Sequence, residues 1–176
     1  MKSEIFRVAL IGPESTGKTT LCIELAKHFN TCWVPEFARE YISALNHPYT
    51  KEDIIHCAEK QLESEEHLQS KAHKILFSDT ELIFCKVWLL DAFGECPEWI
   101  ERKIMENKYD LYLLTTPDLP FIPDPVRENP HRRQYFFDWY KAELEKRKFR
   151  YEIIAGLRKD RLKKAIERVL TADLPD

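Results

Sequence analysis

The sequence predicts a three-layer α/β fold, in which helices cover both faces of a five-stranded parallel sheet. Five short apolar runs rich in β-forming residues alternate along the chain with amphipathic helical stretches, a pattern typical of parallel sheets. A glycine-rich loop, GPESTGKT, joins the first apolar run to the first helical stretch. The length of 176 residues, with 44% hydrophobic residues, suits a single domain over 1–176 with a sizeable core.

The first half of the chain contains two predicted strands and two predicted helices. FRVALIG (6–12) reads as a strand, and KTTLCIELAKHF (18–29) repeats apolar residues at helical spacing. TCWVPEF (31–37) is the second predicted strand, with Pro35 near its end, where a missing N–H is tolerated. A helix then begins after Thr50, which suits an N-cap, and it carries an apolar stripe at Ile54, Ala58 and Leu62.

The second half supplies three more strands and one long loop. KILFSDT (74–80), YDLYLLTT (109–116) and RYEIIAGL (150–157) read as strands, and helical patterns cover 81–93, 97–108, 131–148 and 158–170. Between the fourth strand and its following helix, TPDLPFIPDPVRENP contains five prolines in fifteen residues. Such a segment is neither helix nor central strand, so we expect a functional loop and assign a short lid to approximately 117–133.

Charge and cysteine usage exclude several classes of function. The chain has 27 basic and 30 acidic residues, a net charge of −3, which gives no broad electrostatic surface for nucleic acid or an anionic membrane. Five scattered cysteines form no C-x-x-C pair, so neither a disulfide framework nor a zinc site is indicated. The N-terminal apolar run is too short for a membrane span or a signal peptide. We expect a cytoplasmic protein that acts on small molecules; the sequence leaves the oligomeric state open.

The glycine-rich loop matches the Walker A, or P-loop, pattern G-x-x-x-x-G-K-T. Backbone N–H groups and the positive end of a helix dipole together bind phosphate at such a loop. Lys18 would reach the β- and γ-phosphates of ATP, and the Thr19 hydroxyl would occupy one Mg²⁺ position. The predicted ATP-binding residues are Gly12, Pro13, Glu14, Ser15, Thr16, Gly17, Lys18, Thr19 and Thr20. The fold is thus predicted to be P-loop kinase-like.

Two carboxylates follow strands at the edge where ligands bind in open α/β sheets. Asp79, after the third predicted strand, could hold Mg²⁺, or it could cap the helix that starts near Glu81. Glu36, after the second, could accept the proton of a substrate hydroxyl, while Arg39 could hold an anion or orient that carboxylate. The alternative for Glu36 and Arg39 is a solvated ion pair on a new helix.

The proline-rich loop offers an arginine for catalysis. An arginine carried by a closing lid stabilises the charge of the transferring phosphoryl group and excludes water, which favours transfer to a bound hydroxyl over hydrolysis. Arg127 is the best candidate among Arg127, Arg132 and Arg133. The alternative is a basic surface turn whose arginines pair with Glu128 or Asp138.

Four segments together resemble the ribosylnicotinamide kinase domain of bacterial NadR-type NAD-salvage proteins. GPESTGKTTL, PEFAREY, DTE at 79–81 and PDPVR at 123–127 match it in order and spacing, and the resemblance covers nearly the whole chain. It implies Mg²⁺-dependent transfer of the ATP γ-phosphate to the 5′-hydroxyl of nicotinamide riboside, giving nicotinamide mononucleotide. It also implies that Glu36 and Asp79 engage ribose hydroxyls and metal and that Arg127 belongs to the lid; which carboxylate acts as the base stays open.

The chain departs from this family in one position of the acceptor site. The family has an aromatic residue directly before the strand-two glutamate, where it helps to stack the pyridine ring, whereas this chain has Pro35. Trp33, two residues earlier, is a candidate replacement in substrate binding, or else a core residue. NadR-type proteins also carry an adenylyltransferase domain and some a helix-turn-helix domain; this sequence supplies neither, so we expect no NAD synthesis from the mononucleotide and no DNA binding by that route.

Other functions compatible with a P-loop stay open at this stage. Another nucleoside or deoxynucleoside kinase would keep the same catalytic residues and change only the acceptor pocket. A regulatory ATPase would lack a small-molecule acceptor. The tetrapeptide NKYD (107–110) fits the guanine-reading N-K-x-D pattern but precedes the fourth strand, the wrong end for nucleotide binding. We expect the adenine to lie near Gly156 to Arg158, after the fifth strand.

Overall fold

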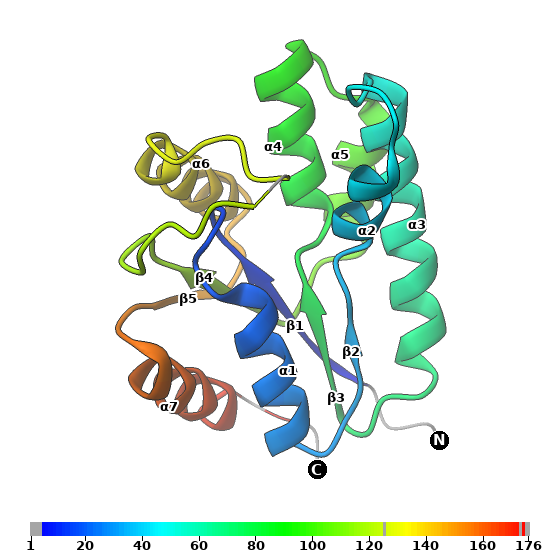
Figure 1. The fold of residues 1–176 in the computed structure, drawn as a ribbon. Coiled ribbons are helices and arrows are strands. Elements are labelled where there is room, and N and C mark those ends of the chain that lie inside the picture. Colours follow the sequence, from blue (N-terminus) through cyan, green and yellow to red (C-terminus); the bar gives the residue numbers. More distant parts are fainter. Residues whose placement is uncertain (1–4, 125, 173, 175–176) are drawn as a thin grey trace.

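The computed structural model describes residues 5–124, 126–172 and 174. Its five strands form one parallel sheet in the order β2-β3-β1-β4-β5 (Figure 1). This confirms the predicted α/β class; residues 1–4, 125, 173 and 175–176 of the proposed domain lie outside the described residues. The elements in chain order are β1 (Phe6–Ile11), α1 (Lys18–His28), β2 (Trp33–Val34), α2 (Phe37–Ala44), α3 (Lys51–Gln69), β3 (Ile75–Asp79), α4 (Leu82–Phe93), α5 (Glu98–Glu106), β4 (Leu111–Thr115), α6 (Arg133–Lys146), β5 (Tyr151–Ile154) and α7 (Arg158–Leu170).

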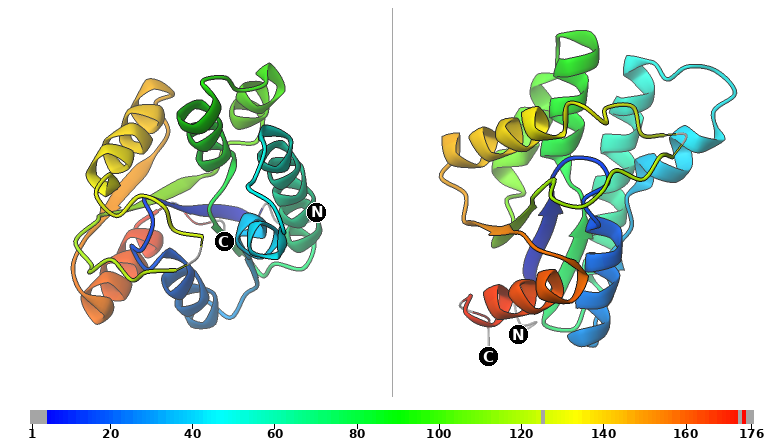
Figure 2. Two further views of the ribbon diagram at one scale, coloured as in Figure 1. Left: turned by 45° about the horizontal axis from the view of Figure 1, so that its top comes forward. Right: turned by 60° about the vertical axis from the view of Figure 1, so that its left-hand side comes forward.

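Helices cover both faces of the sheet, as Figures 1 and 2 show. Because side chains alternate along a strand, β1 faces both layers: Val8 and Leu10 pack with α1 and α7, whereas Ala9 and Ile11 pack with α3, α4, α5 and α6. All four of these side chains are fully buried. A central strand buried on both faces explains the continuous apolar run in the sequence.

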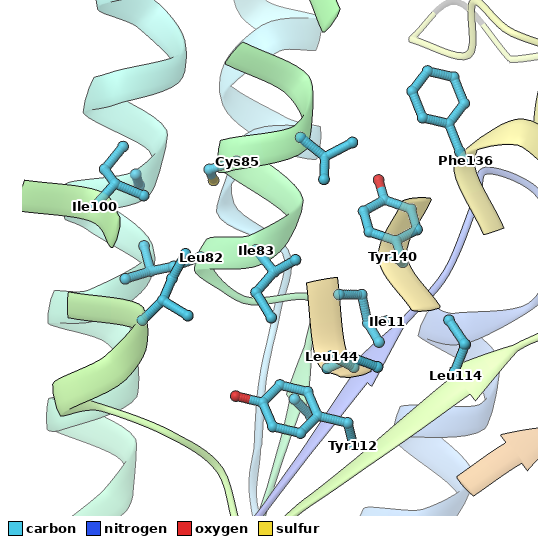
Figure 3. Close-up of a cluster of buried hydrophobic side chains, with 14 of the residues drawn as sticks. Ile11, Leu82, Ile83, Cys85, Ile100, Tyr112, Leu114, Phe136, Tyr140 and Leu144 are labelled. Atoms are coloured by element: carbon cyan, nitrogen blue, oxygen red, sulfur yellow. The ribbon is translucent and has the colours of Figure 1, made fainter. Parts of the chain in front are cut away.

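The larger apolar cluster lies between the sheet and helices α3 to α6 (Figure 3). Tyr112 of β4 is fully buried in it, and its ring stacks on Phe149 with ring centres 5.3 Å apart. Near the carboxyl edge of the sheet, Phe136 and Tyr140 of α6 belong to the same cluster. Burying each large apolar side chain contributes about 1.5–3 kcal/mol, so this layer holds α4 and α6 firmly against the sheet.

The region around Pro35 differs from the prediction. We predicted one strand over 31–37, but β2 has two residues and α2 begins at Phe37. Pro35 has no N–H to donate to the neighbouring strand, which explains why pairing with β3 stops at Val34. The early end of β2 places Glu36 at the N-cap of a helix.

The amino edge of the sheet accounts for the NKYD segment. Asn107 Oδ1 accepts a hydrogen bond from Arg7 Nη1 at 2.6 Å, and Asp110 Oδ2 accepts one from the Arg7 backbone N–H at 2.7 Å. These residues fix β1 beside β4 at the edge opposite the glycine-rich loop, so the rejection of a guanine site agrees with the structure. Within the described residues, no helix is both long and apolar enough to cross a bilayer.

Candidate active site

A cavity of about 410 Å³ opens at the carboxyl edge of the sheet, where β1 leads into α1. The phosphate loop (residues 12–19) supplies one wall, α2 and α4 supply others, and the segment before α6 lies across the top (Figure 2). Ligands of open α/β folds bind at this edge. The lining includes Pro13, Glu14, Ser15, Thr16, Gly17, Lys18, Thr19, Thr20, Glu36 and Arg39.

The fold requires glycine at both glycine positions of the phosphate loop. Gly12 has φ of 152°, and a Cβ there would lie 2.3 Å from the Thr115 side-chain oxygen at the end of β4. Gly17 has φ of 75° and precedes the first residue of α1. Close approach at Gly12 and a left-handed backbone at Gly17 bring the loop's backbone around the position of a bound phosphate.

Lys18 is buried and points back onto its own loop. Its Nζ donates to the carbonyl oxygens of Gly12 at 2.9 Å and Pro13 at 2.7 Å. Burial lowers the pKa of Lys18, opposed by the nearby carboxylates of Glu36 and Asp79. A phosphate group would give this ammonium a charged acceptor, which forms stronger hydrogen bonds than a carbonyl oxygen.

Not every side chain of the loop faces a ligand. The Thr16 hydroxyl is buried and lies 2.6 Å from that of Thr115, and it also donates to Pro13 O at 2.9 Å. Thr16 therefore offers a phosphate its backbone N–H and not its hydroxyl. Gly12 is likewise outside the cavity lining, because its role is the close packing against Thr115.

Thr19 and Asp79 meet at the phosphate loop. The Thr19 hydroxyl donates to Asp79 Oδ2 at 2.5 Å, whereas Asp79 Oδ1 is buried and has no hydrogen-bond partner among the described residues. Burial raises the pKa of Asp79. An unpartnered buried carboxylate oxygen next to a hydroxyl fits Mg²⁺, which in such sites takes one or two protein oxygens and completes its shell with phosphates and water. Consistent with so few protein ligands, no group of three His, Cys, Asp or Glu suited to a metal occurs within the described chain.

Asp79 is not the cap of the following helix. Glu81 occupies the N-cap of α4, and its side chain accepts the Ile83 backbone N–H at 2.9 Å. Thr80, between them, has φ of 68°, an uncommon conformation for a non-glycine residue. The capping alternative for Asp79 is thereby removed, and its carboxylate is available to the phosphate loop.

Glu36 is a cavity-lining carboxylate without a charged partner among the residues that the structure describes. Its side chain makes no hydrogen bond or ion pair within the described part of the chain, and the residue lies between β2 and α2. Burial, together with the neighbouring Asp79, raises its pKa to about 7, although Lys18 and Arg39 act in the opposite direction. A carboxylate with this pKa can accept a proton near neutral pH.

The arginines of the site differ in their partners. Arg39 of α2 forms an ion pair with Asp124, and Arg132 donates to both oxygens of Asp91, at 2.9 and 2.5 Å. Arg127 lines the cavity but donates to neutral groups, the Ile122 carbonyl at 2.5 Å and Ser15 Oγ at 3.5 Å. Of these three, only Arg127 has no ion pair with a described carboxylate.

Arg133 is bound to the loop backbone. Its Nη1 donates to the carbonyl oxygens of Leu119 at 2.8 Å and Ser15 at 3.3 Å. The alternative pairings predicted for the lid arginines, with Glu128 and Asp138, are not the ones found.

Trp33 does not reach the cavity, which corrects its assignment to the substrate site. Its ring packs against the cluster shared by α1, α7 and the sheet, on the face opposite α4 and α6. Pairing of β2 with β3 sets this direction, because Trp33 lies beside Phe77, which is buried in the same cluster. Trp33 is therefore a core residue, the alternative that strand alternation allowed.

An aromatic wall that the sequence did not identify takes that place. Its residues come from three segments distant in sequence, the connection before α3, α4 and α6, and all of them line the cavity. Tyr49 and Trp88 lie with ring centres 5.0 Å apart, and Phe84 and Trp88 lie 5.6 Å apart. The sequence showed four-residue spacings within single helices, as for Phe136 and Tyr140, and such spacing on a helix indicates core. The aromatic wall consists of Tyr49, Phe84, Trp88, Phe136 and Tyr140.

The predicted adenine region is closely tied to the phosphate loop. Asp118 accepts the Gly156 backbone N–H at 2.7 Å and forms an ion pair with Arg161. Arg161 also donates to the Thr16 carbonyl at 2.9 Å. No ligand tests adenine binding at Gly156 to Arg158, and it stays a prediction.

A family model described as "AAA domain" (AAA_28) matches residues 7–161. The chain belongs to this AAA domain family. The match covers the phosphate loop, Glu36, Asp79 and the whole lid segment, so the phosphate loop described above is that of an AAA domain.

Among curated proteins, this AAA domain resembles the trifunctional NAD biosynthesis/regulator protein NadR of Escherichia coli (strain K12). The two are 28% identical over 126 residues, which make up 68% of this chain and 30% of NadR. The chain thus spans about a third of the curated relative that it matches. The resemblance to NadR-type proteins predicted from the four motifs is confirmed.

Solved structures show that the AAA domain has a P-loop kinase-like fold. The structure of NadR protein in complex with NR superimposes with a TM-score of 0.82 at 24% identity, covering 96% of this chain and 51% of that one. NadR in complex with NAD and AMP-PNP gives 0.81 at 24% identity, covering 96% and 49%. A deoxyadenosine kinase from M. mycoides gives 0.62 at 11% identity, covering 94% and 100%. At these identities the likeness concerns the fold.

Proposed function

We propose that this chain is an ATP- and Mg²⁺-dependent kinase that phosphorylates the 5′-hydroxyl of nicotinamide riboside to nicotinamide mononucleotide. The observation that carries the proposal is a single cavity with two ends. The phosphate loop, with Thr19 and Glu36, lines one part of it, Asp79 lies behind Thr19 and is hydrogen-bonded to it, and the aromatic wall lines another part. NadR, whose printed description names NAD biosynthesis and one of whose structures contains NR, supports the choice of acceptor.

The phosphate-loop end suits the donor. The loop N–H groups and the N-terminus of α1 would bind the phosphates of ATP, and Lys18 would contact the β- and γ-phosphates. Thr19 and Asp79 would hold Mg²⁺, which when bound neutralises charge on the transferring phosphoryl group. Arg127 would supply the second positive charge there, since it has no described carboxylate partner to compete with phosphate.

The other end suits an unphosphorylated aromatic nucleoside. Stacking against the aromatic wall would replace the family's aromatic residue that is Pro35 in this chain. Arg39 and Arg132 are each neutralised by an aspartate, so this end offers little to an acceptor phosphate. We assign the base role to Glu36, because it faces the cavity with a pKa near 7, whereas Asp79 is bonded to Thr19.

Another nucleoside or deoxynucleoside kinase is the second candidate. The aromatic wall provides stacking surfaces that suit any aromatic base, and a deoxyadenosine kinase shares the fold. The phosphate-loop chemistry would be identical. Only the acceptor distinguishes the two.

Product analysis with purified protein tests the proposal. ADP release from Mg·ATP is measured alone and with nicotinamide riboside, thymidine or deoxyguanosine, and product masses are recorded. We expect selective formation of nicotinamide mononucleotide, with Lys18→Ala folded by circular dichroism and inactive. Selective phosphorylation of a deoxynucleoside would replace the proposed acceptor, and ADP release indifferent to every acceptor would favour an ATPase.

A further inference from the structure

The stretch that carries Arg127 is held by the side chain of Glu14. Glu14 Oε1 accepts the backbone N–H of Glu128 at 3.1 Å, and Oε2 accepts the backbone N–H of Asn129 at 3.1 Å. Each carboxylate oxygen therefore has its own donor, directly after Arg127 in the chain. Hydrogen bonds from N–H groups to an ionised carboxylate are stronger than those to a neutral acceptor.

The negative charge of Glu14 is unfavourable for binding a triphosphate at the phosphate loop. A carboxylate in a loop that binds a triphosphate repels the ligand, and the loop pattern accepts any residue at this position. Glu14 lies close enough for its charge to oppose the lowering of the Lys18 pKa by burial and to add to the raising of the Glu36 pKa. A negative side chain here needs a role that offsets this repulsion, and the two lid N–H groups provide one.

Two further contacts place the same stretch over the phosphate loop. Ser15 Oγ accepts the Ile122 backbone N–H at 2.8 Å and a weaker bond from Arg127 Nη1 at 3.5 Å. From the other side, the Tyr49 hydroxyl donates to Glu128 Oε2 at 2.9 Å. The phosphate loop thus contacts the lid both before and after Arg127.

We propose that Glu14 is a positioning residue for phosphoryl transfer: its carboxylate holds the backbone at Glu128 and Asn129 and thereby keeps Arg127 over the phosphate loop. The inference rests on the proposed kinase function and goes beyond it, because the residue acts through the lid and not on phosphate. The length of the Glu14 side chain is essential, because its one carboxylate must reach two adjacent backbone N–H groups, those of Glu128 and Asn129.

Two substitutions separate positioning from charge. Glu14→Gln keeps the length but leaves one acceptor oxygen and points an amide donor at a backbone donor. Glu14→Asp keeps the charge but shortens the side chain by one methylene. Glu24→Gln, at an exposed position of α1 in the same part of the molecule, is the matched control for a lost carboxylate. Equal melting temperatures of all four proteins would show that the fold is intact.

Hydrogen exchange of the lid amides is the first measurement. In Glu14→Gln, which keeps a single acceptor oxygen, we expect exchange to be about tenfold faster than in the wild type at Glu128 or Asn129, and in Glu14→Asp, which is too short to reach the lid, at both amides. Glu24→Gln should leave these amides unchanged. Exchange at the wild-type rate in both Glu14 variants would overturn the proposal.

Steady-state kinetics provide the second measurement. We expect both Glu14 variants to lower kcat by about tenfold or more, while KM for ATP changes by less than about threefold, because Arg127 is misplaced and the phosphate loop is intact. If Glu14 acts by charge alone, Glu14→Asp will behave as wild type and Glu14→Gln will lower KM for ATP with kcat unchanged. That result would also overturn the proposal.

The two measurements fail independently. Hydrogen exchange requires no catalytic turnover. If the wild-type protein phosphorylates no nucleoside, the proposed function is contradicted. The exchange result still decides whether Glu14 holds the lid.

Discussion

Glu36 shows how position sets the chemistry of a single carboxylate. The residue type alone allowed a base or a solvated ion pair with Arg39. In the structure Arg39 instead pairs with Asp124, and Glu36 is left facing the cavity, with burial raising its pKa to about 7. A glutamate of ordinary pKa would be a weaker base at neutral pH.

Activity should therefore depend on pH through Glu36. The base must be ionised, so kcat should rise as pH increases through about 7 and then level off. In Glu36→Gln we expect kcat to fall by about 10²–10⁴-fold and this rise to disappear. The measurement is kcat at saturating Mg·ATP from pH 5.5 to 9. A rise near pH 7 that persists in Glu36→Gln would assign the titration to another group, such as a phosphate.

The same pKa has an opposite consequence for stability. Because the folded state raises the pKa of Glu36, folding favours its protonated form, and its contribution to stability declines as pH rises from about 4.5 to about 7. At pH 8 the free energy of unfolding of Glu36→Gln, measured by urea unfolding, should consequently be about 1–2 kcal/mol higher than that of the wild type. At pH 5 the two proteins should differ little.

At the scale of elements, the start of α3 is specified by local sequence. Thr50 and Asp53 form a capping box: Thr50 Oγ1 accepts the Asp53 backbone N–H at 3.3 Å, and Asp53 Oδ2 accepts the Thr50 backbone N–H at 2.8 Å. Both groups lie within four residues, so the predicted N-cap is confirmed without reference to the rest of the fold. Tyr41 of α2 adds a further bond, to Asp53 Oδ1 at 2.8 Å.

Removing the cap hydroxyl should destabilise the protein modestly. We expect Thr50→Ala to lower the free energy of unfolding by about 1 kcal/mol, since one N-terminal N–H of α3 loses its acceptor. Thr50→Ser, which keeps the hydroxyl, is the matched control and should lie within about 0.5 kcal/mol of wild type. Equal losses in both variants would point to the Thr50 methyl group and not to the cap.

At the scale of the whole molecule, Arg7 connects three elements distant in sequence. Its Nη2 donates to Glu65 of α3 at 3.0 Å and its Nη1 to Asn107 after α5 at 2.6 Å, and the guanidinium lies 4.2 Å from the Tyr109 ring centre. Glu65 is almost fully buried, and burial raises its pKa to about 7 despite the attraction of Arg7. The pair holds α3 against the amino edge of the sheet.

Loss of Arg7 should be costly in a pH-dependent way. Arg7→Leu leaves a buried carboxylate unpaired, and we expect a loss of about 3–5 kcal/mol at pH 8, measured by urea unfolding. The loss should be smaller at pH 5.5, because without Arg7 the folded pKa of Glu65 rises further and its neutral form avoids the buried charge. In Arg7→Leu with Glu65→Gln this pH dependence should vanish; its persistence would exclude Glu65 as its source.

The sequence by itself determined the features that are local or periodic. The alternation of apolar runs predicted the class of the sheet, the spacing of GPESTGKT predicted the phosphate loop, and Thr50 predicted the start of α3. Each of these features depends on residues that are close together in the sequence, so it can be predicted without knowledge of the fold. Placement of Asp79 at the same edge also followed, because parallel strands share their carboxyl ends.

Only the tertiary structure decided which distant side chains meet. The aromatic wall joins Tyr49, Trp88 and Tyr140 from three separate segments, and Arg39 meets a lid residue. Trp33 was misassigned because strand alternation fixes two possible faces, and pairing with β3 chooses between them. Many combinations of helix and strand faces satisfy the same sequence pattern, and tertiary packing selects one of them. The ATP-binding part of the site could therefore be predicted, because it is one continuous segment. The acceptor-binding part could not, because it joins side chains from three segments.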